Sequence, residues 1–438
     1  MKVVVVGGGK TGISVAGFYR KMGYEVIIND IKREEEFSPE EMREIKKVAE
    51  FVGGGHSREV FNFAQRIIVS PGVPPSSILK FVRDRDKVKG DVEDAYEWVD
   101  GNVIGITGTK GKTSFSLLIS KVLGEAGYKV FTGGNIGTPY IEAYGKDYDY
   151  IVLELSSFQL EWVEKFRPEV AVLLNLKPDH LDRYKDMGEY FEAKARIFKN
   201  QEKDDIAIIS ADIPFINDFY VKSQTFFFST EKEVDRGAYK ISDRVVLKVS
   251  GVKEFLFDKE VLMRVLSWDN LLAYLIFSEV FGIKEDTYMS VLKSFTPPPH
   301  RLQKAGEWKG IEFYNDSKST TPASVMNALK IIDAPIILIM GGRNKNLSFY
   351  DLREEIRNKA KCVILFGESR EEIKNEIEGC GTDIFVVQNL EEAVEIAVKI
   401  GRKGDRILFS PGCTSFDMFR NYEERGERFI EIVKRYTA

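Results

Sequence analysis

Cysteine and histidine are scarce in this chain. Its 438 residues contain three of each. The cysteines, Cys362, Cys380 and Cys413, form neither a CxxC pair nor a spacing that suggests a disulfide framework. The cytoplasm is therefore the expected compartment.

Long uninterrupted hydrophobic runs are also missing. The longest apolar stretch, around Leu271–Phe281, has Asp269, Asn270 and Glu279 at its edges and inside it, so it does not predict a membrane span. The apolar segment Val3–Val6 is too short for the core of a signal peptide and continues directly into glycines. We expect a protein with no membrane partner.

A strong charge of one sign is absent as well. Lysine and arginine number 63 against 68 aspartates and glutamates, a net charge of −5, which gives no general attraction for nucleic acid. Hydrophobic residues make up 43% and charged residues 30%, as in an ordinary globular protein. There is no internal repeat and no low-complexity tract, and the length suggests about three domains. We expect a monomer.

A glycine-lysine loop is the most informative feature that is present. Val103–Thr107 predicts a short buried strand, Gly108–Thr113 follows it directly, and Ser114–Gly124 carries apolar residues at helical spacing. Glycines let backbone N–H groups approach phosphate oxygens, Lys112 can reach the outer phosphates, and the Thr113 hydroxyl can bind magnesium. The pattern predicts binding of a nucleoside triphosphate; a chance Gly-Lys-Thr in a loop is the alternative.

A second glycine loop lies near the start of the chain. Val3–Val6 predicts a strand, Gly7–Gly12 fits GxGxxG, and Ile13–Met22 predicts a helix. Tyr24–Ile28 predicts the next strand, and Asp30 follows it at the usual place of a ribose contact. The pattern fits the diphosphate and ribose of NAD or of a uridine diphosphate sugar. Close strand–helix packing alone is a further explanation for the glycines.

Strands and helices alternate along most of the chain, which predicts an α/β fold with parallel sheets covered on both faces. Short strands with little helix between Ile206 and Phe257 predict an antiparallel extension, and Thr296–Pro299 predicts a linker. We expect an N-terminal Rossmann-like domain (1–92), a central P-loop-type ATPase sheet domain with that extension (93–297) and a C-terminal Rossmann-like domain (298–438). Further strands are predicted at Ile67–Ser70, Lys129–Phe131, Tyr150–Leu153, Val170–Leu174, Ile336–Met340, Cys362–Phe366, Ile384–Val387 and Ile407–Ser410, and a helix at 188–200.

Two strand ends in the central region carry side chains suited to chemistry. Glu154 closes one buried strand, and a carboxylate there, near Thr113, is a plausible magnesium ligand because Mg²⁺ prefers hard oxygen atoms. His180 follows the next strand, at the edge where active-site groups of open α/β sheets collect. A solitary histidine is more often a satisfied surface residue, so its position alone makes His180 a candidate and no more.

The order of the short motifs resembles that of the Mur ligases. The motifs are Gly108–Thr113, Gly134–Gly137, Glu154–Glu161, Asp179–Tyr184, Tyr190–Lys194, His300–Arg301 and Asn315–Thr320. The resemblance covers essentially the whole chain. The N-terminal glycine loop and the segment Ser410–Asp417 favour the member of the family that adds D-glutamate.

This resemblance implies roles for individual residues. The UDP-sugar would contact Gly9, Thr11, Asp30, Ser70 and Asn135. ATP would contact Gly108, Thr109, Gly111, Lys112, Thr113, Asn270, Arg301 and Asp316. Two magnesium sites would use Thr113, Glu154, His180 and a carbamylated Lys194. The amino acid would contact Lys318, Thr320, Lys345, Ser415 and Phe416, while Lys112, Lys194 and His180 would be catalytic.

The activity that the resemblance implies is ATP-dependent amide formation. The γ-phosphate of ATP would move to the L-alanyl carboxylate of UDP-N-acetylmuramoyl-L-alanine, giving an acyl phosphate that the amine of D-glutamate attacks. Such chemistry depends on positioning and charge neutralisation more than on a protein nucleophile. The product would be a cytoplasmic precursor of peptidoglycan.

Two segments depart from the family pattern. Where the family often has His-Asn-x-x-Asn, Leu266–Asn270 matches only at the final Asn, so Asp269 or Trp268 becomes a candidate for adenine recognition. In the glycine loop Gly341–Lys345, Arg343 stands where an acidic residue is common. That extra cation leaves strict selectivity for D-glutamate open.

Three alternatives remain at this point. Folylpolyglutamate synthase shares the chemistry but would not need the glycine-rich segment 1–90. Mur ligases that add diaminopimelate or lysine typically carry Asp-Asn-Pro-Arg, which this sequence lacks. An NAD-binding oxidoreductase or regulatory protein could be built on Gly7–Gly12.

Overall fold

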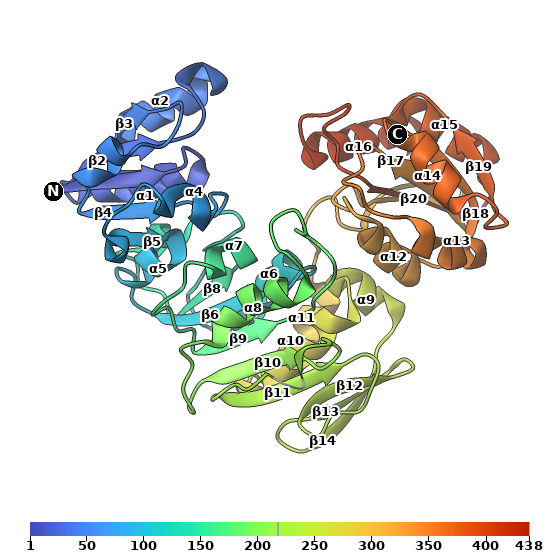
Figure 1. The fold of residues 1–438 in the computed structure, drawn as a ribbon. Helices are drawn as coiled ribbons and strands as arrows, with labels where there is room; N and C mark the ends of the chain where they lie inside the picture. Colours follow the sequence, from blue (N-terminus) through green and yellow to red (C-terminus); the bar gives the residue numbers. More distant parts are fainter. Residues whose placement is uncertain (217–218, 438) are drawn as a thin grey trace. The chain divides into compact units, whose positions relative to one another are not determined.

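The computed structural model describes residues 1–216 and 219–437, whose strands form three sheets (Figure 1). The chain divides into two compact units. One comprises Met1–Leu256 and Asp269–Val291, and the other Phe257–Trp268 and Leu292–Ala438. The α/β architecture expected from the alternation of strands and helices is confirmed.

The first sheet has five parallel strands in the order β3-β2-β1-β4-β5. Its central strand has Val3 to Val6 fully buried, as expected for a strand covered on both faces. The strands are β1 (Lys2–Val6), β2 (Glu25–Asn29), β3 (Glu50–Val52), β4 (Arg66–Val69) and β5 (Val88–Gly90). The helices are α1 (Lys10–Lys21), α2 (Pro39–Val48), α3 (Arg58–Asn62), α4 (Pro75–Leu79) and α5 (Asp91–Tyr96).

The second sheet has nine strands in the order β14-β13-β12-β11-β10-β9-β6-β8-β7. Its strands are β6 (Asn102–Thr107), β7 (Val130–Gly134), β8 (Tyr150–Glu154), β9 (Val170–Leu173), β10 (Ile206–Ser210), β11 (Gln224–Ser229), β12 (Gly237–Ile241), β13 (Arg244–Lys248) and β14 (Val252–Leu256). Its helices are α6 (Lys112–Glu125), α7 (Ser157–Leu160), α8 (Met187–Ala195), α10 (Trp268–Val280) and α11 (Glu285–Ser294).

The antiparallel extension of this sheet is present but begins later than the sequence suggested. Strands β12, β13 and β14 pair antiparallel. Strands β10 and β11 instead continue the parallel sheet from β9, and β12 joins β11 in parallel. The sequence analysis missed this because it found little helical pattern between these strands, whereas parallel strands are usually connected by a helix.

The third sheet lies in the second unit, in the order β15-β16-β20-β17-β18-β19. Its antiparallel pair, β15 with β16, was not predicted, whereas the other four strands were. The strands are β15 (Gln303–Trp308), β16 (Ile311–Asn315), β17 (Ile336–Gly341), β18 (Ala360–Phe366), β19 (Asp383–Val386) and β20 (Arg406–Gly412). The helices of this unit are α9 (Lys259–Val265), α12 (Pro322–Ile331), α13 (Arg353–Lys359), α14 (Arg370–Ile377), α15 (Leu390–Ile400) and α16 (Tyr422–Thr437).

Within the described residues, no single helix has the length and apolarity needed to cross a membrane. One bent pair, α9 with α10, meets the criterion by length and composition only. Most of α10 is buried among the other elements, with Leu271 to Phe277 inaccessible to solvent, which is the property of a core helix.

Candidate functional site

The phosphate loop joins β6 to α6, as the sequence predicted. Gly108 and Gly111 have φ values of +149° and +85°, which side-chain-bearing residues rarely adopt, and α6 begins immediately afterwards at Lys112. The Lys112 ammonium is held by the loop itself, because Nζ donates hydrogen bonds to Gly108 O at 2.8 Å and Thr109 O at 3.1 Å. A helix N-terminus and a fixed cation therefore lie in one loop.

Asn175, at the end of β9, holds the middle of this loop. Its Oδ1 accepts a hydrogen bond from Lys110 N at 2.9 Å, and its Nδ2 donates to Lys110 O at 3.2 Å. Its main-chain oxygen accepts from Thr109 N at 3.1 Å. The sequence analysis noted this strand end but gave Asn175 no role; a polar residue at the carboxyl end of a buried strand was the available signal.

Two of the predicted site residues, Thr113 and Asn135, form hydrogen bonds with a third, Glu154. Thr113 Oγ1 donates to Glu154 Oε2 at 2.8 Å, and Asn135 Nδ2 donates to Glu154 Oε1 at 2.9 Å. Glu154 is 3% exposed. Hydroxyl and carboxylate oxygens of this kind suit magnesium, which keeps several of its waters. Residues 1–216 and 219–437 contain no group of three or more His, Cys, Asp and Glu side chains that could bind a metal.

Lys194 extends from α8 to the same loop. Its side chain is 1% exposed, and Nζ donates to Gly108 O at 3.0 Å and lies 4.6 Å from the centre of the Tyr190 ring. Burial, and secondly the nearby charge of Lys112, hold the pKa of Lys194 well below its usual range. Gly108 O thus accepts from two lysines, and the more deeply buried one favours the neutral amine.

His180 lies in the segment after β9 with a φ of +56°. Its ring is 4.7 Å from the ring of Phe158 and 6.0 Å from that of Tyr190, centre to centre. Burial lowers the pKa of His180, and Lys194 lowers it further, while Asp179 opposes this. This direction favours the neutral imidazole, and the role expected for His180 stays a prediction.

The N-terminal glycine loop is fixed by Asp30, whose Oδ2 accepts a hydrogen bond from Gly8 N at 2.7 Å. A Cβ on Gly12 would lie 1.9 Å from Gly7 O, so this glycine is required for close packing of α1 on the loop. The Ser70 hydroxyl beside Gly7 is buried and has no hydrogen-bond partner within the described chain. A buried unpaired hydroxyl at this edge is a suitable contact for a ligand.

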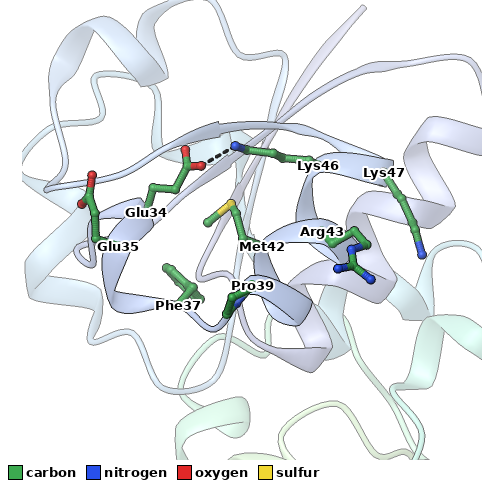
Figure 2. Close-up of a pocket in the computed structure, with 8 residues that line it drawn as sticks. All are labelled: Glu34, Glu35, Phe37, Pro39, Met42, Arg43, Lys46 and Lys47. Carbon is green, nitrogen blue, oxygen red and sulfur yellow. Dashed lines mark hydrogen bonds and ion pairs between the residues drawn. The ribbon is translucent and has the colours of Figure 1, made fainter.

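A shallow hollow of about 880 Å³ lies beside this loop, between the 3₁₀ helix η1 (Glu34–Glu36) and α2 (Figure 2). Phe37 separates the two, since a Cβ on Gly8 would approach its ring to 3.1 Å. None of the residues predicted to contact the UDP-sugar lines this hollow. Two of its charged side chains are paired, Lys46 with Glu34 and Lys47 with Glu44, and Arg43 also lines it.

In the second unit, two loops predicted to face the amino acid are joined. Arg343 and Thr414 exchange backbone hydrogen bonds at 3.0 Å in both directions, and Thr414 Oγ1 donates to Arg343 O at 2.8 Å. The loop that carries Lys345 therefore lies beside the segment that carries Ser415 and Phe416. Lys345 is exposed, Ser415 is buried and Phe416 is 63% exposed.

The extra cation of this loop is neutralised. Arg343 Nε lies 2.8 Å from Glu368 Oε2 in an exposed ion pair. The departure from the family pattern at Arg343 is thus accompanied by a carboxylate that offsets its charge.

Asp316 lies at the end of β16, with Lys318 and the half-buried Thr320 shortly after it. The Asp316 carboxylate accepts hydrogen bonds from Ser410 Oγ at 2.8 Å and Leu302 N at 3.2 Å, and burial raises its pKa to about 6. Arg301 is close enough for its charge to oppose that rise. The Lys318 ammonium lies 5.1 Å from the centre of the Tyr422 ring. Asn270, the third expected adenosine contact, belongs to the other unit.

The sequence analysis missed a buried arginine in the second unit. Arg425 is 0% exposed and donates to Ser317 O at 2.8 Å and Ser317 Oγ at 3.1 Å. Arg425 lies on α16, and an arginine on a helix is usually expected at the surface. The one signal of its burial was its position four residues before Phe429, on the same face of the helix. Arg425 ties α16 to the segment between Asp316 and Lys318.

Comparisons with known proteins agree across the chain. Residues 1–85 match the N-terminal domain described as Mur ligase MurD-like, residues 106–265 the Mur ligase middle domain, and residues 300–413 the glutamate ligase domain of Mur ligases. The protein named UDP-N-acetylmuramoylalanine–D-glutamate ligase of Geobacter sp. (strain M21) is 39% identical over 441 residues, 99% of this chain and 97% of that protein. The protein of the same name from Geotalea daltonii is 38% identical with the same coverage.

A solved structure with the same fold is the MurF ligase from Thermotoga maritima in complex with ADP. It has a TM-score of 0.61 and 18% identity, covering 94% of this chain and 95% of that chain. The match at residues 1–85 argues against folylpolyglutamate synthase and against an unrelated NAD-binding protein. On these grounds the chain belongs to the Mur ligase family.

Proposed function

We propose that the chain is an ATP-dependent UDP-N-acetylmuramoylalanine–D-glutamate ligase, acting in the cytoplasm as a monomer on a precursor of peptidoglycan. Support comes from full-length relatives of that name and from the polar network around the phosphate loop. The single observation that carries the proposal is the convergence of Lys112 and Lys194 on Gly108 O beside the Thr113–Glu154 pair.

The proposed division of labour uses three domains with the bounds expected from the sequence, 1–92, 93–297 and 298–438. The N-terminal edge would bind the UDP-sugar through the glycine loop, Asp30 and Ser70, since a diphosphate needs N–H donors and a ribose needs a carboxylate acceptor. The phosphate loop would bind ATP through its N–H groups and Lys112. Arg301 and Asp316 would contact the adenosine together with Asn270.

Magnesium fits the donors at this edge of the sheet. The Thr113 hydroxyl and Glu154 carboxylate are hard oxygen ligands, a neutral His180 can contribute a nitrogen, and a carbamate on Lys194 would add two anionic oxygens. When bound, the ions would neutralise charge on the phosphates and on the transferring group. The deeply buried amine of Lys194 suits carbamylation, because the neutral amine is the form that attacks carbon dioxide.

In the first step of the proposed reaction, a carboxylate oxygen of the L-alanyl group bonds to the γ-phosphorus of ATP as the bond to the bridging oxygen breaks. ADP leaves, and the acyl phosphate remains. The neutral amine of D-glutamate then attacks the carbonyl carbon, and the tetrahedral intermediate expels phosphate and loses a proton from nitrogen. Lys112 would stabilise charge that develops during the first step, and the fixed loop would position the reactants.

The function is tested by phosphate release from ATP with UDP-N-acetylmuramoyl-L-alanine and a panel of amino acids. D-Glutamate should give rapid release that depends on both substrates, and mass spectrometry should detect the amide. Release with meso-diaminopimelate or L-lysine instead, or no release with any amino acid, would contradict the proposal.

Lys345→Ala should raise the KM for D-glutamate about tenfold while changing the KM for ATP little. The reason is that Lys345 is a cation on the exposed loop joined to Thr414, and hydrogen bonds to charged groups contribute about 1.5–3 kcal/mol, reduced here by exposure. Initial rates at varied D-glutamate and varied ATP would measure both constants.

Arg343→Ala is the matched control for Lys345, because Arg343 lies in the same loop but is paired with Glu368. Its KM for D-glutamate should remain near the wild-type value. D-Glutamine, which lacks the side-chain charge, should be a poor substrate for the wild type. Equal rates with D-glutamine and D-glutamate would show that this pocket does not recognise the side-chain carboxylate.

A further inference from the structure

The first turn of α10 reaches the phosphate loop in two ways, directly at Gly111 and through Asn175 at Lys110. A Cβ on Gly111 would lie 2.7 Å from Asn270 Oδ1, so a larger residue does not fit there. One residue before Asn270, Asp269 Oδ2 accepts a hydrogen bond from Asn175 Nδ2 at 3.1 Å. The same Asn175 amide makes the two hydrogen bonds to the backbone of Lys110. Asp269 is therefore connected to the loop through one intermediate side chain.

The three partners of the Asn175 amide are complementary. Lys110 N is a donor and faces the amide oxygen, whereas Lys110 O and the Asp269 carboxylate are acceptors and face the amide nitrogen. An ionised carboxylate can only accept, so Asp269 opposes a rotated amide that would present oxygen to it. With its Oδ1, its main-chain oxygen and both Nδ2 protons engaged, the side chain of Asn175 is fixed.

We propose that Asp269 is a positioning residue of the nucleotide site, which fixes the phosphate loop by orienting the amide of Asn175. This role rests on the proposed function, because it requires that the loop bind the phosphates of ATP. It concerns a position within the stretch Leu266–Asn270, where the chain departs from His-Asn-x-x-Asn. The first turn of α10 would then have two roles: Asn270 would contact the adenine, and Asp269 would help to hold the loop that carries Lys112 in one conformation.

The charges around Asp269 are compatible with its being an acceptor. Burial raises the pKa of Asp269 to about 6, the hydrogen bond from Asn175 and the charge of Lys177 oppose that rise, and Asp212 and Glu231 add to it. At pH 8 the carboxylate is therefore ionised. The role assigned to Asp269 depends on its hydrogen bond with Asn175 and not on its charge. A neutral side chain that accepts a hydrogen bond in the same place should therefore perform the same role.

Asp269→Ala and Asp269→Asn separate these properties. Alanine removes the acceptor, and calorimetry at pH 8 with magnesium should show an ATP Kd about tenfold higher, the effect of losing about 1.4 kcal/mol. Asparagine can turn its own oxygen toward Asn175 and should bind ATP within about threefold of wild type, since the hydrogen bond is retained. The Kd for UDP-N-acetylmuramoyl-L-alanine should be unchanged in both.

A double-mutant cycle with Asn175→Ala tests whether Asp269 acts through Asn175. In that background, Asp269→Ala should change the ATP Kd less than about twofold, because coupled residues are not additive. Glu231→Gln is the matched control. The charge of Glu231 acts on the pKa of Asp269, so this variant removes a nearby carboxylate charge but keeps the hydrogen bond to Asn175, and its ATP Kd should be near the wild-type value.

If Asp269→Ala does not fold, the pair Asn175→Asp and Asp269→Asn replaces it. Asn175→Asp places two carboxylates together and also loses the hydrogen bond to Lys110 O, so it should weaken ATP binding. Adding Asp269→Asn should restore binding in part, because an amide then donates to the new carboxylate while the bond to Lys110 O stays lost. Unchanged Kd in Asp269→Ala, equal loss in Asp269→Asn, additivity in the cycle, or no restoration by the reciprocal pair would each overturn the proposal. Binding is measured directly, so a wild-type protein that binds ATP but does not ligate D-glutamate would contradict only the proposed function.

Discussion

Replacing Lys112 by alanine is expected to reduce kcat for ligation by about 10²–10³. The variant loses a cation that the loop holds through Gly108 O and Thr109 O and that, in the proposed mechanism, stabilises charge on the transferring phosphoryl group. Removing one such preorganised electrostatic donor typically costs about 2.7–4 kcal/mol of transition-state stabilisation. Single-turnover phosphate transfer, measured with saturating substrates, would give the value.

The fold should survive this change. Helix α6 is secured by Phe115, Leu118 and Ile119, all fully buried, and not by its first residue. Lys121→Ala, about two and a half turns further along the same helix, is the control for loss of a lysine and should keep near-normal activity. A Lys112→Ala enzyme with more than about half of the wild-type kcat would show that this loop does not bind the reacting phosphates.

Sequence reasoning succeeded where local signals and site chemistry coincide. The segment Val103–Thr107 is apolar and β-branched, a glycine loop follows, and the next apolar residues repeat at helical spacing, so β6, the loop and α6 were all predictable. The strand end at Glu154 was equally clear, and its pairing with Thr113 follows from their shared edge of a parallel sheet. These features depend on residues close in sequence or on a rule of topology.

What could not be predicted depends on contacts between distant residues. Asp269 meets Asn175 across 94 positions, and nothing in either neighbourhood specifies the other. The burial of Arg425 likewise depends on a partner, Ser317, 108 positions away. Strand β10 pairs in parallel with both β9 and β11. The direction of this pairing depends on the neighbouring strands of the sheet, and the periodicity of a short segment does not indicate it.

Lys194→Ala is expected to lower ligation to below about one per cent of wild type, and short carboxylates such as formate or acetate should restore part of the activity. The reason follows from the proposed carbamate: the Lys194 amine is buried, 3.0 Å from Gly108 O, with a pKa held well below its usual range, and the neutral amine is the form that would add carbon dioxide and lose a proton. Alanine leaves a space in which a free carboxylate can supply the oxygens of the missing carbamate. Without that carboxylate, the loss of transition-state stabilisation should be comparable to the loss of one electrostatic donor. Rates at increasing formate, with and without bicarbonate, would measure the recovery.

Lys194→Arg separates the carbamate from a simple requirement for volume or positive charge. Guanidinium stays protonated in proteins and cannot form the carbamate, and its bulk would exclude an added carboxylate, so this variant should be inactive and should not respond to formate.

Lys199→Ala, which changes an exposed lysine just beyond the same helix, is the control and should behave as wild type. Full activity of either Lys194 variant, or no carbamate signal in the ¹³C NMR spectrum of an active magnesium-bound enzyme equilibrated with ¹³C-bicarbonate, would contradict the carbamate. Rescue of the alanine variant by formate but not by chloride at equal ionic strength would show that the oxygens themselves are needed. The charge of Lys112, which helps to lower the pKa of Lys194, would then attract the anionic carbamate, whereas burial opposes an ammonium and a carbamate alike.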